Sequence, residues 1–288
     1  MQKDFCLGSQ WLYYKIYTGV KTADYILLEK LAPVIGDLQR KNSIQKWFFI
    51  RYKDPDDHIR IRFQINKTED LAAVIQAFYN VFNRLIEQNL VWKIQTDTYQ
   101  REIERYGKST MQESEFLFWK DSEMALLYIE IKSSFDTLEF PLLFTFFAID
   151  SFLNLFRLSN QEKLSLLDSL QLSFKKEFDV EKTQKKEMNK SYRTLYPKIE
   201  QFLSPYLKND LAEIFDIVDE KSQQINKTVL IIRDKIEISL PGFLSGHIHM
   251  MLNRQYTSKQ RMYELIVYDH LFRYYKTQEY KKLATTKL

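Results

Sequence analysis

Cysteine is almost missing from this sequence, and its absence excludes two classes of structure. Cys6 is the single cysteine among 288 residues, so the chain can form no internal disulfide and no multi-cysteine metal site. A reducing, cytoplasmic location is therefore the default expectation. The N-terminus also lacks a basic segment followed by an apolar core, so we predict no signal peptide.

Other features are scarce as well. The chain has only six glycines and six prolines, which favours long helices over a sandwich of short strands. Its most apolar stretch, residues 141–156, is too short and too polar to span a bilayer. The net charge is only +4, from 42 basic and 38 acidic residues, so nothing indicates nucleic-acid binding. Glycine-rich phosphate loops and zinc-ligand spacings are absent, and we expect no metal or organic cofactor.

The first 110 residues combine strand and helix patterns. After a loose lead-in over residues 1–10, the pattern predicts, in order, a strand at 11–18, a helix from residue 22, hairpin strands at about 46–52 and 58–65, a helix at 68–88 and a strand at 91–101. This β-α-β-β-α-β order is the ferredoxin-like arrangement.

From residue 111 the periodicity is helical. Helices are predicted at about 112–132, 137–158, 161–177, 183–204, 208–224, 227–237, 242–253 and 256–275. The last ten or so residues are expected to fray. We therefore predict one α+β domain over residues 1–288, with an α+β region to about residue 110 and a mainly helical region over 111–288.

The predicted hairpin carries the first candidate site. On its second strand Ile59, Ile61 and Phe63 share one face, while His58, Arg60 and Arg62 share the other. Two guanidinium groups on one face suit a carboxylate or phosphate, because arginine offers paired planar donors. The alternative is an ordinary solvated face paired with acidic neighbours.

Two later stretches bear on that choice, residues 99–107 (YQREIERYG) and 245–254 (SGHIHMMLNR). With the hairpin they give HxRxRF, then YxRExxRYG, then SxxxHMxxNR. This ordered set resembles the C-terminal domain of class I lantibiotic dehydratases, which also occurs alone in thiopeptide-type bacteriocin biosynthesis proteins. The resemblance runs from Trp11 to about Tyr274.

The resemblance implies an enzyme, a lyase. In full-length dehydratases one domain uses glutamyl-tRNA to esterify serine or threonine of a ribosomal precursor peptide. The C-terminal domain then eliminates glutamate and leaves dehydroalanine or dehydrobutyrine. By resemblance, this chain is the stand-alone elimination component of a split dehydratase. Its expected partners are the glutamylated peptide and a separate tRNA-dependent glutamylation protein. A homodimer is also implied.

The same resemblance implies the site residues. The elimination residues of the family fall on Arg62, Arg101 and His249. His249 would transfer a proton, at Cα or at the leaving group, and the arginines would bind the glutamyl carboxylate and the developing oxyanion. We expect Arg101→Ala or His249→Ala to leave the fold intact. Further candidates for substrate binding are His58, Arg60, Arg105, Asn253 and Arg254.

Each of these residues also has a structural interpretation. Arg101 and Arg105 stand beside Glu102 and Glu104 and could form surface ion pairs, while His247 is interpreted as structural. One position departs from the family pattern. Lys108 stands where a second glycine often follows the tyrosine-glycine pair, which leaves the conformation of that turn open.

Two other functions stay open. Stand-alone relatives include thiopeptide pyridine synthases, which join two dehydroalanines in a formal [4+2] cycloaddition on the same scaffold. The third alternative is a non-catalytic scaffold that binds the precursor peptide or a glutamylating partner. Retention of the arginine and histidine set favours elimination.

Overall fold

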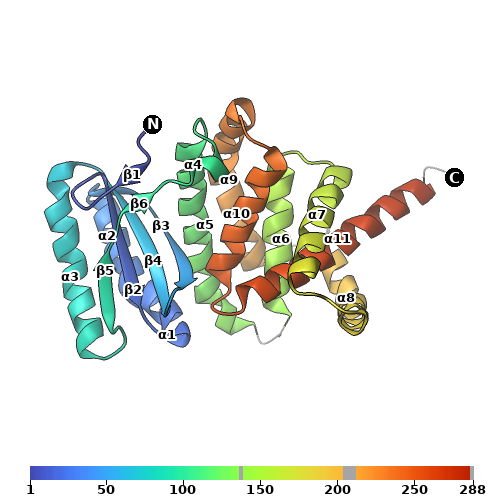
Figure 1. Ribbon diagram of the computed structural model, residues 1–288, viewed down its shortest axis with the longest axis horizontal. Helices are drawn as coiled ribbons and strands as arrows, with labels where there is room; N and C mark the ends of the chain where they lie inside the picture. The colour runs from blue at the N-terminus through green and yellow to red at the C-terminus, as the bar shows by residue number, and fades with distance from the viewer. Residues whose placement is uncertain (136–138, 204–211, 286–288) are drawn as a thin grey trace.

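The computed structural model describes residues 1–135, 139–203 and 212–285. A small antiparallel sheet occupies the N-terminal end of the molecule, and helices make up the rest (Figure 1). The predicted α+β class is confirmed. Residues 137–138, 204 and 208–211 of the predicted helices lie outside the described ranges.

The sheet has the predicted ferredoxin-like topology. Its strands, in the spatial order β3-β4-β2-β5, are β3 (Ile44–Lys53), β4 (Asp57–Ile65), β2 (Trp11–Tyr17) and β5 (Lys93–Thr96). Every neighbouring pair is antiparallel. Strands β3 and β4 form the predicted hairpin. Residues that pair across it, such as Phe48 and Arg62, have side chains on the same side of the sheet.

Helices cover one face of this sheet, the face that carries Ile59, Ile61 and Phe63. They are α1 (Val20–Tyr25), a π-helical turn (Ile26–Leu31), α2 (Ala32–Arg40), a 3₁₀ turn (Thr68–Asp70) and α3 (Leu71–Glu87). Ile59, Ile61 and Phe63 are buried beneath them, as the alternation of β4 predicted. The opposite face, which carries Arg62, therefore turns toward the helical region.

The helical region contains α5 (Met111–Ile131), a 3₁₀ turn (Lys132–Ser134), α6 (Phe140–Leu155), α7 (Asn160–Glu177), α8 (Lys182–Phe202), α9 (Ala212–Lys235), α10 (Leu240–Gln255) and α11 (Gln260–Thr285). Helix α5 stands between the sheet and the other helices (Figure 1). Its residues join both hydrophobic clusters, so the two regions share one packed boundary.

Three predictions of local structure were wrong. The strand expected over 91–101 is divided into β5 and β6 (Tyr99–Gln100), and β6 pairs with β1 (Asp4–Phe5) in the segment expected to be a loose lead-in. The helices expected at 208–224 and 227–237 form one helix, α9, because no glycine or proline separates them. The C-terminal residues expected to fray continue α11 to Thr285.

Candidate functional site

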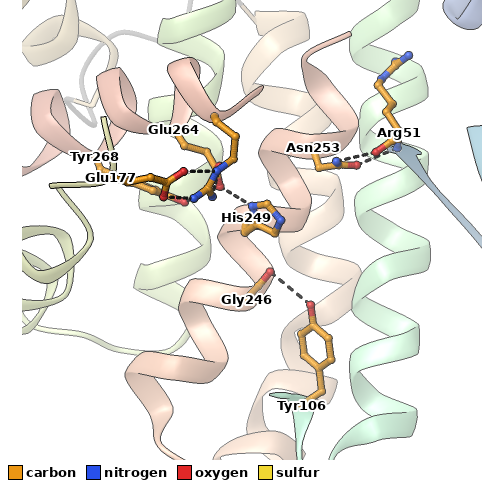
Figure 2. A network of polar contacts seen from close by, with 9 residues as sticks. Arg51, Tyr106, Glu177, Gly246, His249, Asn253, Glu264 and Tyr268 are labelled. Carbon is orange, nitrogen blue, oxygen red and sulfur yellow. Dashed lines mark hydrogen bonds and ion pairs between the residues drawn. The ribbon is translucent and has the colours of Figure 1, made fainter. Parts of the chain in front are cut away.

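Helix α10 carries the third sequence motif and contacts both the YxRExxRYG motif and the hairpin. Ser239 caps its start, where its hydroxyl accepts a hydrogen bond from Gly242 N at 3.4 Å. At Gly246 the helix passes the YxRExxRYG motif, and the Tyr106 hydroxyl donates to the Gly246 carbonyl at 3.4 Å (Figure 2). Of the motif residues on α10, Arg254 is buried, whereas Ser245, His249, Met250 and Asn253 are partly exposed.

Gly246 lets α10 lie close to the motif helix α4 (Ile103–Tyr106). A Cβ atom at this position would lie 3.3 Å from both the Arg105 Cδ and the Tyr106 Cε1, a tight contact that a shift of a few tenths of an ångström would relieve.

Asn253 fastens α10 to the hairpin. Its side-chain amide accepts from the Arg51 backbone N–H at 2.9 Å and donates to the Arg51 carbonyl at 2.8 Å (Figure 2). Arg51 lies on β3, an edge strand of the sheet, so Asn253 satisfies backbone groups that have no strand partner. Asn253 was expected to bind substrate, but its side-chain amide is engaged by the Arg51 backbone and connects α10 to the hairpin.

This connection gives a stability prediction. Asn253→Ala leaves two partly buried backbone groups unpaired, and we expect the free energy of unfolding to fall by about 1–3 kcal/mol. Urea unfolding measures the change. As the control, Asn83→Ala on α3 removes an exposed contact with Glu87 and should alter stability by no more than about 0.5 kcal/mol. Equal effects of the two variants would contradict the role of Asn253.

Arg62 lies among aromatic rings on the sheet face turned toward the helices. The register places it opposite Tyr13 on β2 and Phe48 on β3. Its guanidinium carbon is 4.2 Å from the Tyr13 ring centroid and 5.1 Å from that of Tyr99. Burial lowers the pKa of Arg62, and its Nε has no hydrogen-bond partner among the described residues. The group is therefore a desolvated cation with a free donor.

Arg62 is partly buried, and Arg254 contributes a second, fully buried guanidinium to the same cavity of about 40 Å³. It is 1% exposed, and its Nε donates to the Ser122 hydroxyl at 3.1 Å. Its two terminal nitrogens have no hydrogen-bond partner in the described part of the chain, and Asp121 lies 3.8 Å from one of them. Burial lowers its pKa to about 10, so it stays charged at neutral pH.

This arrangement selects an anion. A cavity of this size exceeds the space that a single water needs, and it offers several unpaired N–H donors. The unpaired N–H donors of the two arginines carry a desolvation cost, which a bound carboxylate would offset. The other lining residues include the apolar side chains of Phe48, Tyr106, Phe118 and Met250, together with Gln100 and Glu102, and the Glu102 carboxylate pairs with Arg105.

Arg101 lies elsewhere, in a buried ion pair. It is 3% exposed and donates to both carboxylate oxygens of Glu115, at 2.6 and 2.7 Å, and to the Gln2 carbonyl at 3.1 Å. The Tyr99 hydroxyl donates to the same carboxylate at 2.9 Å. From the sequence we expected Arg62, Arg101 and His249 to share one pocket, but neither Arg101 nor His249 lines the cavity of Arg62, and Glu115 occupies the Arg101 donors. Arg101 instead supports Tyr99, whose ring faces Arg62.

His249 lies at the junction of two surface grooves. The hairpin-side groove, of about 450 Å³, is formed by the hairpin end, the start of α1, His249, Asn253 and residues 257–261. The helix-side groove, of about 300 Å³, is formed by Arg105, His249 and residues of α7, α10 and α11. The imidazole is 32% exposed. An extended peptide that lay along both grooves would pass over this ring.

One nitrogen of the His249 ring is occupied. Nδ1 lies 2.5 Å from Oε1 of Glu264 on α11 (Figure 2). This is the only hydrogen bond of the ring among the described residues. Because a carboxylate only accepts, Nδ1 is the donor, and Nε2 of the neutral ring is left as an acceptor.

The remaining candidates surround these features. His58 is buried, stacks on Tyr17, and accepts a hydrogen bond from Arg60 Nε at 3.0 Å. Burial lowers the pKa of His58, so it is a neutral acceptor near pH 7. Arg60 covers the Tyr52 ring at 3.3 Å. Arg105 is exposed and pairs with Glu102 at 2.9 Å, which matches the surface-pair interpretation.

Of four further polar residues, sequence reasoning missed Glu115 and Glu264, and it noted Asp121 and Ser122 as resembling a family element without assigning them a role. Glu115 and Glu264 are partners of predicted site residues. Asp121 and Ser122 connect α5 to neighbouring elements, because Asp121 pairs with Lys221 and Ser122 bonds Phe49 N and Arg254. Three of these four lie on α5, 14 or more residues from the partners described here, so sequence spacing gave no signal.

The turn at Lys108 is not strained. Gly107 has a φ of +77°, a conformation that favours glycine, and a Cβ there would lie 2.6 Å from the Thr110 hydroxyl. Lys108 is exposed and is not among the described non-glycine residues with positive φ. Only the first glycine of the family pattern is therefore required in this chain.

His247 is structural, as interpreted from the sequence. Its ring is fully buried among Tyr106, Phe118 and Phe243, and burial holds its pKa well below the ordinary value. The unfolded chain binds a proton at this residue below about pH 6.5, whereas the folded chain does not. This residue therefore favours unfolding increasingly as the pH falls below about 6.5.

A pH prediction follows for His247→Phe. The substitution removes the group that takes up a proton when the chain unfolds. The free energy of unfolding should therefore fall less steeply below about pH 6.5, by up to about 1.4 kcal/mol per pH unit. Urea unfolding of both proteins across that range measures the two slopes. His58, whose lowered pKa acts in the same direction, is present in both and does not bias the comparison. Parallel slopes would contradict a buried neutral His247.

Residues 1–135, 139–203 and 212–285 include no group of three or more histidine, cysteine, aspartate or glutamate side chains placed to hold a metal ion. Within the same ranges, no helix combines the length and the apolar character needed to cross a bilayer.

Comparison with known proteins gives consistent matches. The family model described as lantibiotic biosynthesis dehydratase C-term matches residues 11–275. The subtilin biosynthesis protein SpaB of Bacillus subtilis is 31% identical over 171 residues, which cover 58% of this chain and 16% of that protein. The nisin biosynthesis protein NisB of Lactococcus lactis is 31% identical over 119 residues, 40% of this chain and 11% of that protein. The chain thus matches less than a fifth of the length of these two relatives.

Two solved structures share the fold. The tRNA-dependent lantibiotic dehydratase MibB from Microbispora sp. 107891 superposes with a TM-score of 0.74 at 18% identity, over 94% of this chain and 28% of that one. The pyridine synthase TbtD from thiomuracin biosynthesis superposes with a TM-score of 0.61 at 13% identity, over 93% of this chain and all of that one. At these identities the similarity concerns the fold alone.

Proposed function

Because the chain belongs to the lantibiotic biosynthesis dehydratase C-terminal family, we propose that it eliminates glutamate from glutamylated serine or threonine residues of a ribosomal precursor peptide. A base removes the Cα proton, the electron pair forms the Cα=Cβ bond, and the Cβ–O ester bond breaks to release glutamate. The products are a dehydroamino acid and a free carboxylate. A separate tRNA-dependent glutamylation protein would supply the ester.

One observation carries this proposal, the partly exposed His249 ring with its Nδ1 engaged by Glu264. The neutral ring then presents Nε2 as a proton acceptor at the junction of two grooves. Abstraction of a Cα proton requires a base that can reach the substrate with an unoccupied lone pair. We therefore assign His249 to proton abstraction at Cα.

The buried arginines supply the second requirement. Elimination develops negative charge on the amide oxygen and on the leaving carboxylate, and preorganised cations stabilise both. Arg62 and Arg254 offer unpaired donors in a cavity whose wall includes Met250, the residue after His249. We assign these two arginines to a carboxylate of the glutamyl group. Arg101 supports them indirectly, because it binds Glu115, which accepts a hydrogen bond from Tyr99, and the Tyr99 ring contacts Arg62.

Incubation of the purified protein with a chemically glutamylated peptide tests the proposal. We expect mass spectrometry to show loss of glutamate and formation of a dehydroamino acid. A peptide that binds but keeps its ester would support the scaffold alternative. Conversion of an already dehydrated peptide to a cyclic product would support the pyridine-synthase alternative, which otherwise rests on fold similarity alone. Either result, without glutamate release, would overturn the proposal.

A further inference from the structure

Glu264 is a buried carboxylate that the sequence motifs do not include. Its side chain is 1% exposed and lies on α11, whereas His249 lies on α10. Oε1 accepts from His249 Nδ1 at 2.5 Å (Figure 2) and from the Tyr268 hydroxyl at 3.2 Å, and Oε2 accepts from Arg261 Nη1 at 2.9 Å. Both oxygens are thus engaged by three donors.

Two of these donors come from the same helix as Glu264. Arg261 precedes it by three residues and Tyr268 follows it by four, so all three side chains project from one face of α11. Arg261 also donates to Glu177 on α7 through two nitrogens, but both side chains of that pair are exposed, so it adds little to the position of Glu264. The carboxylate is therefore held in place independently of His249, and the ring must adjust to the carboxylate.

We propose that Glu264 is the positioning residue for His249, fixing the ring orientation and the Nδ1–H tautomer so that Nε2 accepts the substrate proton. This inference rests on the proposed function for its catalytic consequence, but its structural part does not. In free histidine the Nε2–H tautomer competes, and in that form the exposed nitrogen would be a donor and could not act as a base.

The contacts also argue against a direct chemical role for Glu264. A general base must reach the proton that it removes, with an unoccupied lone pair directed at the substrate. Glu264 is almost fully buried, and its oxygens already accept from His249, Tyr268 and Arg261. Of the two partners, His249 is the one with exposed surface in the grooves.

Tautomer measurement tests the structural part without any enzymatic assay. The chain has four histidines, so ¹⁵N-histidine labelling gives few signals, and His249→Ala identifies the relevant one. At about pH 8.5, well above the ordinary histidine pKa of about 6.5, we expect a protonated Nδ1 at His249. In Glu264→Ala the ring should move to the Nε2–H form. An Nε2–H ring in the unaltered protein, or an unchanged spectrum in the variant, would overturn the inference.

The catalytic part needs a variant that keeps the fold. Glu264→Gln preserves size and can still bond Tyr268 and Arg261, so stability should change little compared with Glu264→Ala. We expect Glu264→Gln to lower kcat for glutamate release by about 10-fold or more while KM changes by less than about 2-fold, because positioning acts on the chemical step. Glu264→Asp, which keeps the charge, should recover part of the activity lost in Glu264→Ala.

Glu177→Gln is the matched control. It alters the other carboxylate partner of Arg261 but has no contact with His249 among the described residues. We expect its kcat and its His249 tautomer to match those of the unaltered protein. If Glu177→Gln lowers kcat as much as Glu264→Gln, the loss of activity comes from weakened contacts between α7 and α11, and the inference fails. If no variant, nor the unaltered protein, releases glutamate while the tautomer shift is seen, the proposed function fails and the positioning role stands.

Discussion

We expect His249→Ala to lower the rate of glutamate elimination by about 10²–10⁴-fold, the usual contribution of a positioned general base. The substitution removes the group that accepts the Cα proton, while the glutamylated peptide still binds through the grooves and the Arg62–Arg254 cavity. Glutamylated peptide should therefore accumulate, with KM changed much less than kcat. Single-turnover kinetics on a purified glutamylated peptide, followed by mass spectrometry, measures the loss.

The fold should tolerate this change. The His249 ring is partly exposed, and Glu264 keeps its contacts with Arg261 and Tyr268 after the ring is removed. Circular dichroism and the urea midpoint check that stability is retained. Lys198→Ala, which removes only an ion pair with Glu139 outside both grooves, is the activity control. A His249→Ala protein that releases glutamate at the normal rate would show that another group removes the proton.

Arg101→Ala should have its main effect on stability, with a fall in the free energy of unfolding of about 3–5 kcal/mol. The substitution leaves the fully buried Glu115 carboxylate without its cation and removes a contact with the N-terminal segment at Gln2. The sequence-based expectation that this variant keeps its fold intact is revised on these contacts. Urea unfolding measures the loss, and any fall in elimination must then be corrected for the unfolded fraction.

The same motif contains the matched control. Arg105 makes an exposed pair with Glu102, and Arg105→Ala should cost no more than about 1 kcal/mol. A second comparison separates the buried charge from the lost packing. Replacing both partners, Arg101→Met with Glu115→Leu, should recover much of the stability, because no uncompensated charge remains. Similar stabilities for Arg101→Ala and Arg105→Ala would mean that Glu115 finds another partner or takes up a proton.

These two variants separate roles that the motifs alone treat alike. The family resemblance implies a site role for both His249 and Arg101, but His249 is partly exposed at a groove junction and Arg101 is buried against a carboxylate. A motif makes a residue a candidate for the site, but it does not show which neighbouring groups already form hydrogen bonds with that residue. Arg254 illustrates the reverse case, since its unpaired terminal nitrogens make it a stronger candidate than the sequence indicated.

Local patterns in the sequence determined the α+β class, the hairpin and the alternation of β4, because strand and helix periodicity is a property of neighbouring residues, while the candidate site residues of α10 were implied by the family resemblance. The tertiary structure decided which polar groups meet. Glu115 reaches Arg101, Glu264 reaches His249, and Arg62 meets Arg254 only once the sheet packs against the helices. Those pairings depend on burial and on contacts between distant segments, which no local spacing encodes, and they divide the motif residues into chemical and supporting ones.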